Sequence, residues 1–352
     1  MARSKKKKKT APRQKLRPVA DWPTLPKEQL LQLPIRRLAL RIEGTEIEPL
    51  VHELHGELRD RGFRYLPHVW LSDEWFCPDG VPGFAIPFYL AHPRLKRLEQ
   101  EFMLEVEGST REECLALMRH ETAHAIANAY RVHRRRDWQQ HFGRSSQRYP
   151  QWYLPHPYSK RFVVHLENWY AQSHPDEDWA ETFAVWLTPG FDWRAHYHGW
   201  PALKKLEYVE RLMAELRERR PPVRTRRKQS PANHLRITLA SHYRNKQARY
   251  GAKHPPFYDE DLRRLFPGNT PESETGARWL RRHRMELTSI VANWTKEYRY
   301  RIDQVLKDMI RHCEQLGLRA HTQDPQLKLH VIAFITRLVM DYLHSGKFRV
   351  RV

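Results

Sequence analysis

The chain has 352 residues, of which 40% are hydrophobic and 11% aromatic. This is enough apolar material for one sizeable core and a second, smaller one, so two folded domains are expected. Lys and Arg outnumber Asp and Glu by 62 to 41, and the formal net charge of +21 is large enough to attract polyanions. Because no apolar run approaches the roughly 20 residues needed to cross a bilayer, we expect a soluble protein without a membrane span.

The cellular compartment is indicated by the N-terminus and by the cysteines. The opening MARSKKKKKTAPRQKLRPVADWP passes from lysines to prolines without the apolar stretch of a secretory signal. Only three cysteines occur, and Cys77, Cys114 and Cys313 lie far apart with no CxxC pair. A reducing, cytoplasmic setting is therefore expected.

The first elements follow a segment without periodic apolar residues. Residues 1–20 are predicted to be a disordered basic tail, because such a composition cannot offset its own ordering entropy. A short helix is predicted over 27–33. The runs RYLPHVWL and GFAIPFYL are rich in aromatic and branched residues and flank the turn-like CPDGVPG, so we predict two strands joined by a loop. Pro87 in the second run favours an edge strand.

Two helices with clear start signals come next. Ser109 can cap the first, because Glu112 lies three residues later at the spacing of a capping box, and the helix is predicted to run to about His133. The second is predicted to begin at His174 and Pro175, since proline at a first helical position costs no hydrogen bond. Its pattern, DEDWAETFAVWL, continues until a TPG sequence stops it.

These elements predict a division of the chain into two domains. Residues 21–216 are expected to form an α+β domain of short strands and helices with irregular connections. The segment 217–230, RERRPPVRTRRKQS, has paired prolines and almost no apolar residues, so we predict that it is a basic linker. Residues 231–352 are expected to form a mainly α-helical C-terminal domain.

The expected C-terminal domain contains two long apolar patterns. Over 276–316 apolar residues, Trp294 and Tyr298 among them, recur at helical spacing, which predicts one long helix with these aromatics in its core stripe. A second apolar helix is predicted over 325–343. These helices either recruit a partner protein or cover an active-site cleft, and the sequence does not decide between the two roles.

The segment HETAH carries the main functional signal. On a helix, His120 and His124 project from one face about 5 to 6 Å apart, which suits two corners of a tetrahedral zinc site. Glu121 points to the side, where a carboxylate can act as general base on zinc-bound water. In a chain with 21 histidines such a match can arise by chance, but here it lies on a strongly predicted helix followed by small apolar residues.

A catalytic zinc needs a third protein ligand. Glu177 is the candidate, with Glu181 one turn later on the same face as a carboxylate that can hold a histidine N–H, although either glutamate can be the ligand. The alternative is that these acids, with Asp176 and Asp178, only favour the N-terminus of their helix, as acidic first turns usually do.

HETAH followed by SHPDEDWAETFAVWL resembles a bacterial family of zinc-binding metallopeptidases, gluzincin-like zincins that pair HExxH with a downstream HPxEDWAETxA segment. The resemblance covers Arg64 to Pro189. It implies a zincin fold with an active-site helix beneath a small twisted sheet, zinc held by His120, His124 and Glu177, and Glu121 as catalytic base. Many members begin with a cysteine-bearing zinc ribbon where this chain has lysines, so no role tied to that ribbon is expected.

The developing negative charge on a cleaved carbonyl needs a second donor beside zinc. Tyr170, His165 and His174 lie just upstream of Glu177, and we select Tyr170. His196 and His198, in HYHGW, also have a suggestive spacing. Because they lie two residues apart in an aromatic loop, we expect them to pack or to hydrogen-bond rather than to bind metal.

The sequence therefore predicts a zinc metallopeptidase that acts on peptides or proteins, with one catalytic Zn²⁺. The alternative is a basic protein that binds nucleic acid or ribosomes and has a structural or vestigial zinc site. The net charge, the polylysine start and the cations interleaved with aromatics in NWTKEYRYRIDQ and SHYRNKQARY support it. Against it, those aromatics sit at core spacing with the charges on the opposite face, which is typical of packed helices.

Overall fold

The structure, a computed structural model, describes residues 18–344 apart from 151, 152, 154, 251–258, 269–272 and 321–324. The fold is α+β and mostly helical, with a two-stranded sheet. Residues 1–17 of the predicted basic tail lie outside the described residues. Its end is ordered, because the backbone N–H of Val19 donates to the carbonyl of Arg37 over 2.9 Å. None of the described helices is long and apolar enough to span a membrane.

The two predicted strands form a parallel pair, β1 (His68–Ser72) and β2 (Gly83–Pro87). His68 is opposite Gly83, where a Cβ atom would overlap both the carbonyl oxygen and the ring of His68. The loop between the strands folds back on β2, and Phe76 forms an antiparallel bridge with Ala85. All of β2 is buried, because β1 and α4 cover it.

The motif helix is α4 (Arg111–Tyr130), and it begins one residue later than predicted. Thr110, not Ser109, is the N-cap. Its hydroxyl accepts a hydrogen bond from the backbone N–H of Glu113, and the Glu113 carboxylate accepts one from the backbone N–H of Thr110. Ser109 instead donates to the Glu113 carboxylate over 3.3 Å. The pattern Ser-Thr-Arg-Glu-Glu contains two overlapping capping boxes, and the structure uses the second.

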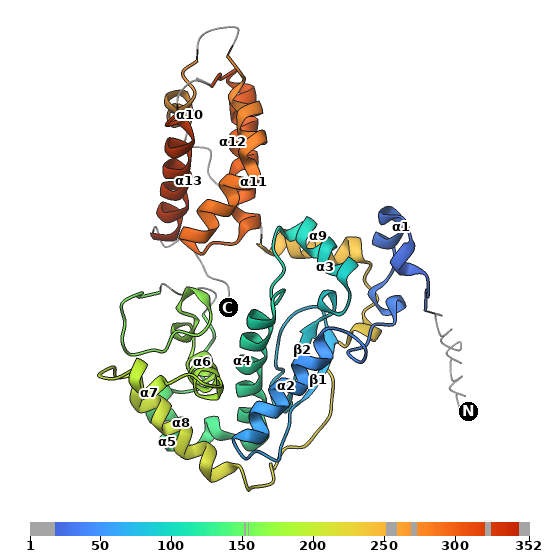
Figure 1. Cartoon of the computed structure of the whole chain (residues 1–352), viewed down its shortest axis with the longest axis vertical. Coiled ribbons are helices and arrows are strands. Elements are labelled where there is room, and N and C mark those ends of the chain that lie inside the picture. Colours follow the sequence, from blue (N-terminus) through green and yellow to red (C-terminus); the bar gives the residue numbers. More distant parts are fainter. Residues whose placement is uncertain are drawn as a thin grey trace, which may run out of the picture.

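The second predicted helix is α6 (Pro175–Leu187), and its bounds agree closely with the sequence analysis. His174 is the N-cap, with its Nδ1 accepting from the N–H of Asp176 over 3.2 Å. The helix packs against α4, where the indole of Trp179 donates to the carbonyl of Ala123 over 2.9 Å (Figure 1). This buried bond fixes the register of the two helices.

The helices around this pair complete the first core. Helix α2 (Ile47–Asp60) packs against α4, and α8 (Leu203–Leu216) packs against α6. The others are α1 (Lys27–Leu31), α3 (Pro93–Met103), α5 (Arg136–Phe142), α7 (Trp193–His196) and α9 (Leu239–Tyr250), with 3-10 turns that include η5 (Glu167–Gln172) and η6 (Ala232–His234).

The C-terminal helices are α10 (Asp259–Leu265), α11 (Gly276–Thr295), α12 (Arg299–Gln315) and α13 (Leu327–His344). The single helix predicted over 276–316 is wrong, because the chain turns at Lys296 (φ 58°) and α12 packs back against α11 (Figure 1). Trp294 lies at this turn and is 79% exposed, so its predicted place in the core stripe is also wrong.

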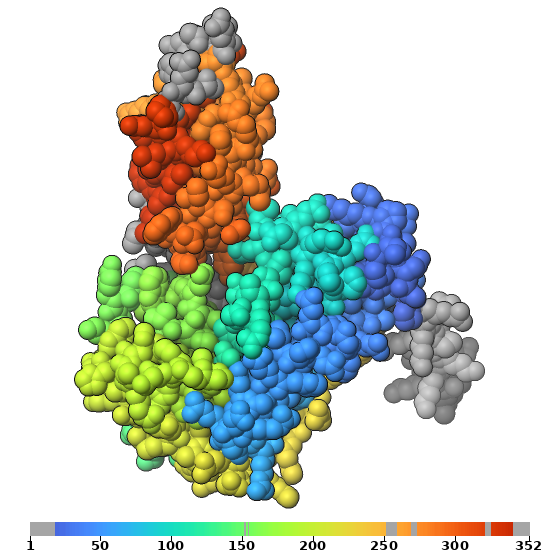
Figure 2. Space-filling model, viewed as in Figure 1, coloured from blue at the N-terminus to red at the C-terminus, as the bar shows by residue number. Residues whose placement is uncertain are grey.

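The two hydrophobic cores differ from the predicted division of the chain. The first core extends as far as Tyr243, whereas the second begins at Leu262. The expected linker at 217–230 is fixed against β1 rather than free between domains. The C-terminal helices stand on one side of the larger unit (Figure 2), where Lys296 Nζ lies 3.0 Å from Glu167 Oε1 of η5.

Candidate metal centre

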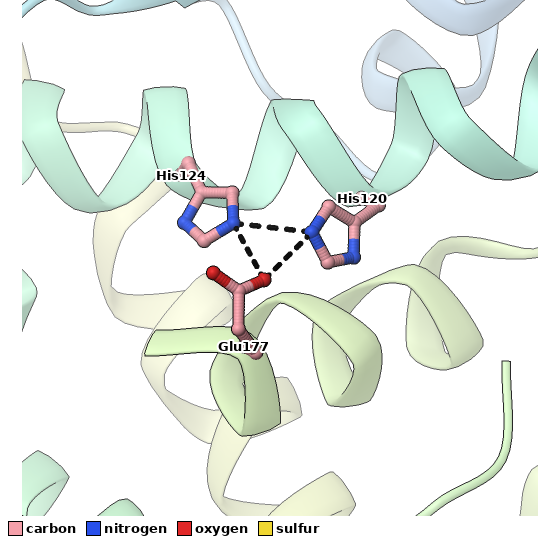
Figure 3. A group of neighbouring side chains, drawn as sticks. All are labelled: His120, His124 and Glu177. Carbon is pink, nitrogen blue, oxygen red and sulfur yellow. Dashed lines mark hydrogen bonds and ion pairs between the residues drawn. The ribbon is translucent and has the colours of Figure 1, made fainter. Parts of the chain in front are cut away.

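Two helices bring three ligand-type side chains to one point. His120 and His124 lie one turn apart on the face of α4 that packs against α6, and Glu177 lies in the first turn of α6 (Figure 3). Glu177 Oε2 is 3.0 Å from His120 Nε2 and 3.3 Å from His124 Nε2, and the two nitrogens are 3.2 Å apart. This buried group can hold a metal ion.

Glu181 orients His120 by binding the ring nitrogen that does not face the other two ligands. Its Oε1 lies 2.8 Å from His120 Nδ1, while its Oε2 accepts from the N–H of Leu166 over 2.8 Å. Because a carboxylate oxygen accepts, Nδ1 carries a proton toward Glu181, which leaves Nε2, on the Glu177 side, as the ring nitrogen that can bind a metal. This is the tautomer in which an imidazole binds a metal. Of the two candidate glutamates, Glu177 is therefore the one in the ligand position.

The protonated histidines and the ionised glutamates of the group stabilise one another. Burial opposes protonation of His120, but its hydrogen bonds to Glu177 and Glu181 outweigh burial and raise its pKa well above the usual value. Burial would raise the pKa of Glu177, yet the neighbouring His124 and His120 lower it overall. The centre thus stabilises a carboxylate beside positive charge, and a bound cation can supply that charge in place of protons.

Glu121 lies beside the three ligands but does not join them. Its residue is 8% exposed, and Oε2 is buried without a hydrogen-bond partner among the described residues. Burial raises the pKa of this carboxyl group, although the nearby His124 and His120 oppose the increase. A buried carboxylate oxygen without a partner is costly, so its position fits an acceptor for a proton supplied at the centre.

Tyr170 also lies against the centre. Its ring centroid is 5.6 Å from that of His120, and no hydrogen bond holds its hydroxyl within the described residues. It follows Asn168 and Trp169, which have positive φ values of 61° and 53° inside η5. Such a conformation is costly for tryptophan, and strain of this kind is concentrated at functional sites.

The two histidines weighed beside Tyr170 have other partners. His165 Nε2 donates to the carbonyl of Ala116 over 3.0 Å, and His174 caps α6 while its Nε2 donates to Gln147 O over 3.1 Å. His196 and His198 are exposed and lie outside the three-residue group. The ring of His196 packs among aromatic side chains, 4.7 Å from that of Tyr197 between centroids.

The acidic residues next to Glu177 also have specific partners. Asp176 accepts from the hydroxyl of Ser145 over 3.0 Å. Asp178 lies 2.5 Å from Lys205 Nζ, and burial raises its pKa to about 7 although Lys205 lowers it. Both side chains therefore connect α6 to its surroundings, and neither joins the three-residue group.

Tyr149 is a site residue that the sequence analysis did not identify. Its hydroxyl donates to Glu177 Oε1 over 3.0 Å, and its ring stacks on that of His174 with centroids 3.7 Å apart. The loop that carries it has no periodic pattern, and nothing in SSQRYPQWY distinguishes this tyrosine from Tyr153. Its role becomes visible only when the loop is placed over the start of α6.

No family model, curated protein or solved structure matches the chain. The resemblance to zinc-binding metallopeptidases therefore depends on the two motifs, and the function must be argued from the centre itself.

Proposed function

We propose that this protein is a zinc-dependent metallopeptidase that hydrolyses peptide bonds in peptides or proteins. The observation that carries the proposal is the meeting of His120, His124 and Glu177 at one point, beside a carboxylate oxygen of Glu121 that has no hydrogen-bond partner among the described residues. Three ligands and a free base are the protein groups that a zinc hydrolase needs.

The donor set supports zinc as the metal. Two imidazole nitrogens and one carboxylate oxygen are ligands that zinc binds at about 2.0 to 2.2 Å, which places tetrahedral ligand atoms about 3.3 Å apart. The three separations here are 3.0, 3.2 and 3.3 Å. No fourth His, Cys, Asp or Glu joins the group within the part of the chain that the structure describes. A fourth position left for water is characteristic of catalytic zinc, whereas structural sites are closed by protein ligands.

Zinc at this position would lower the pKa of a bound water to about 7 and polarise the substrate carbonyl. Glu121 accepts the proton of the attacking water and delivers it to the departing amine. Its burial supports this role, because burial raises the pKa of the carboxyl group and so makes it a better proton acceptor than an exposed glutamate. Glu181 keeps His120 in its metal-binding tautomer throughout.

The substrate carbonyl oxygen also needs a donor from the protein as negative charge develops on it. Tyr170 supports this role, because its ring contacts that of His120 and its hydroxyl has no hydrogen bond among the described residues. Burial and the nearby Glu177 carboxylate raise its pKa well above the usual value, so the hydroxyl keeps its proton. Tyr149 holds the outer oxygen of Glu177 instead.

The fold and family belong to the same proposal. A helix carrying HExxH packs against a small sheet on one side and a second helix carrying the glutamate on the other, which supports a zincin arrangement. The segment from Arg64 to Pro189 resembles the bacterial zinc-binding metallopeptidases over the same elements. A structural or vestigial zinc site is less well supported, because neither needs the base at Glu121.

The test combines metal content with cleavage of a broad library of denatured proteins and peptides. Wild type is expected to hold about one zinc per chain and to cut. Glu121→Gln should keep the metal and lose cleavage by at least about a hundredfold, whereas His120→Ala should lose both. His196→Ala, which removes an exposed histidine outside the centre, is the matched control and should behave as wild type. A wild-type protein without zinc contradicts the proposal, and so does cleavage that survives Glu121→Gln.

A further inference from the structure

The segment 223–230, which we call the strap, connects α8 to η6 and is fixed along β1. Three side chains at alternate positions of β1 each donate a hydrogen bond to a backbone carbonyl of the strap. These bonds join His68 Nε2 to Arg227 O at 3.0 Å, Trp70 Nε1 to Gln229 O at 2.9 Å, and Ser72 Oγ to Ser230 O at 2.7 Å. Alternate strand residues share one face, so the strap follows that face of the sheet.

The chain is also fixed where it enters the strap. The N–H of Val223 donates to the carbonyl of Ala129 at the end of α4 over 3.1 Å. The hydroxyl of Tyr130 donates to the carbonyl of Arg219 over 3.0 Å. The backbone is thus held at both ends of the strap, and the side chains from Arg224 to Lys228 between these points are exposed.

Four of the five side chains from Arg224 to Lys228 are basic. Arg224, Arg226, Arg227 and Lys228 are exposed, and none of them pairs with a carboxylate among the described residues. The sequence contains no Asp or Glu between Glu218 and Asp259 that would neutralise the row. Arginines of the C-terminal helices are different, because several bind acidic partners: Arg281 binds Glu314, Arg282 binds Glu274 and Arg284 binds Asp303.

We propose that the strap binds the sugar–phosphate backbone of a nucleic-acid duplex. Guanidinium groups form bidentate hydrogen bonds with phosphate, and three of the four cations are arginines. An extended chain advances about 3.3 Å per residue, so the row from Arg224 to Lys228 spans about 13 Å, which matches about four base-pair steps along the axis of a duplex. Because β1 already orders the backbone, binding costs less conformational entropy than it would for a flexible tail.

The composition of the strap favours a duplex over other polyanions. Residues 223–230 contain no aromatic side chain on which an unpaired base could stack, so the strap offers single strands no platform. An acidic peptide can meet the same cations, but it is flexible and must be ordered on binding, whereas a duplex presents a rigid row of phosphates. The contacts are to the backbone, and binding should therefore be independent of base sequence.

The experiment measures binding of the full chain to a labelled 20-base-pair DNA duplex by fluorescence anisotropy at several salt concentrations. The strap variant changes four residues to glutamine: Arg224, Arg226, Arg227 and Lys228. The matched control makes the same change at four exposed cations elsewhere on the surface: Arg41, Arg59, Arg97 and Arg211. Thermal unfolding of both variants checks that they are folded.

The strap variant should weaken binding at least about tenfold and should reduce the slope of log K against log salt by about 3 to 4. The control should lose less than about threefold. Trp70→Phe keeps a ring against His68 but removes the bond to Gln229, so it should weaken binding without a change of charge. Equal losses in the two glutamine variants would overturn the proposal, since binding would then depend on diffuse charge. A polyglutamate with the same total charge as the duplex should displace the labelled duplex less effectively than unlabelled duplex does. If it displaces the label equally well, the proposal is overturned in favour of an acidic protein partner.

Discussion

The hydroxyl of Tyr149 donates to Oε1 of Glu177 over 3.0 Å, and this bond leaves Oε2 of the same carboxylate facing the two histidines. Tyr149 is 42% exposed, so it orients a buried ligand from the surface of the molecule. A ligand carboxylate fixed in this way contributes one oxygen to the metal and uses the other for orientation.

Tyr149→Phe should therefore weaken metal binding by about tenfold while leaving the fold intact. The ring that stacks on His174 remains and only the hydroxyl is lost. Zinc affinity can be measured by competition with a chelating dye. Tyr158→Phe is the control, because Tyr158 is 95% exposed. An unchanged affinity in Tyr149→Phe would show that the bond does not orient the ligand.

Glu181→Gln should lower zinc affinity by about 10- to 100-fold. A glutamine amide is a weaker acceptor for His120 Nδ1 than a carboxylate, and it also removes negative charge from behind the ligand. Isothermal titration of the metal-free protein with zinc measures the effect. Glu207→Gln changes an exposed glutamate of α8 and should titrate as wild type does.

Removal of the metal should lower thermal stability. A ligand present at 100 times its dissociation constant stabilises the folded state by about 2.7 kcal/mol, which corresponds to about 5 to 10 °C in Tm. Thermal unfolding measured with and without a strong chelator should show this difference in Tm for wild type and for Glu121→Gln. His120→Ala should show no shift, because it lacks a ligand. Equal shifts in all three proteins would place the stabilising metal elsewhere.

Acid should destabilise the protein through His242, which is 5% exposed and packs edge-on against Phe88. Burial, helped by the charge of Lys246, lowers its pKa to about 4. The neutral ring therefore contributes stability that is complete above about pH 6.5 and is lost as the pH falls towards 4, up to about 3 kcal/mol. Urea unfolding across this range should show a smaller pH slope for His242→Phe than for wild type. The exposed His198→Phe is the control, and an identical slope in His242→Phe contradicts the assignment.

The cap of α4 can be tested separately. Thr110→Ala should lower the free energy of unfolding by about 1 kcal/mol, because it removes the acceptor for the N–H of Glu113. Ser109→Ala should cost less than half of that, since its hydroxyl contacts only the exposed Glu113 side chain. Chemical denaturation of the two variants measures both losses of free energy of unfolding. A larger loss in Ser109→Ala than in Thr110→Ala would show that Ser109 is the N-cap.

The sequence was most informative where local signals agree. The start of α6 at Pro175 and its end before Thr188 follow from proline at a first helical position and a TPG stop, which act within a few residues. The capping residue of α4 was wrong by one position, because Ser109 and Thr110 both have a glutamate three residues later and only their backbone angles decide. His120 and His124 were predicted as a pair because helical spacing places them on one face, whereas Glu177 was selected from its place in the first turn of the next predicted helix and from the family resemblance.

Features that depend on distant contacts could not be predicted. Tyr149 reaches Glu177 only through the path of its loop. The turn at Lys296 interrupts an unbroken apolar pattern, and the left-handed backbone there is favoured only because α12 can pack on α11. The expected linker becomes the strap because donors on β1 meet its carbonyls, and a segment with almost no apolar side chains gives no sign of such a partner.

The close approach at Gly83 limits how this protein can change by mutation. The ring of His68 lies between the backbone at Gly83 and the carbonyl of Arg227, which it holds. Any side chain at position 83 must displace that ring, so a single substitution would disturb the sheet and release the strap together. In a library of random variants selected for folding and for binding by the strap, position 83 should remain glycine, while the exposed Arg226 should vary freely under selection for folding alone.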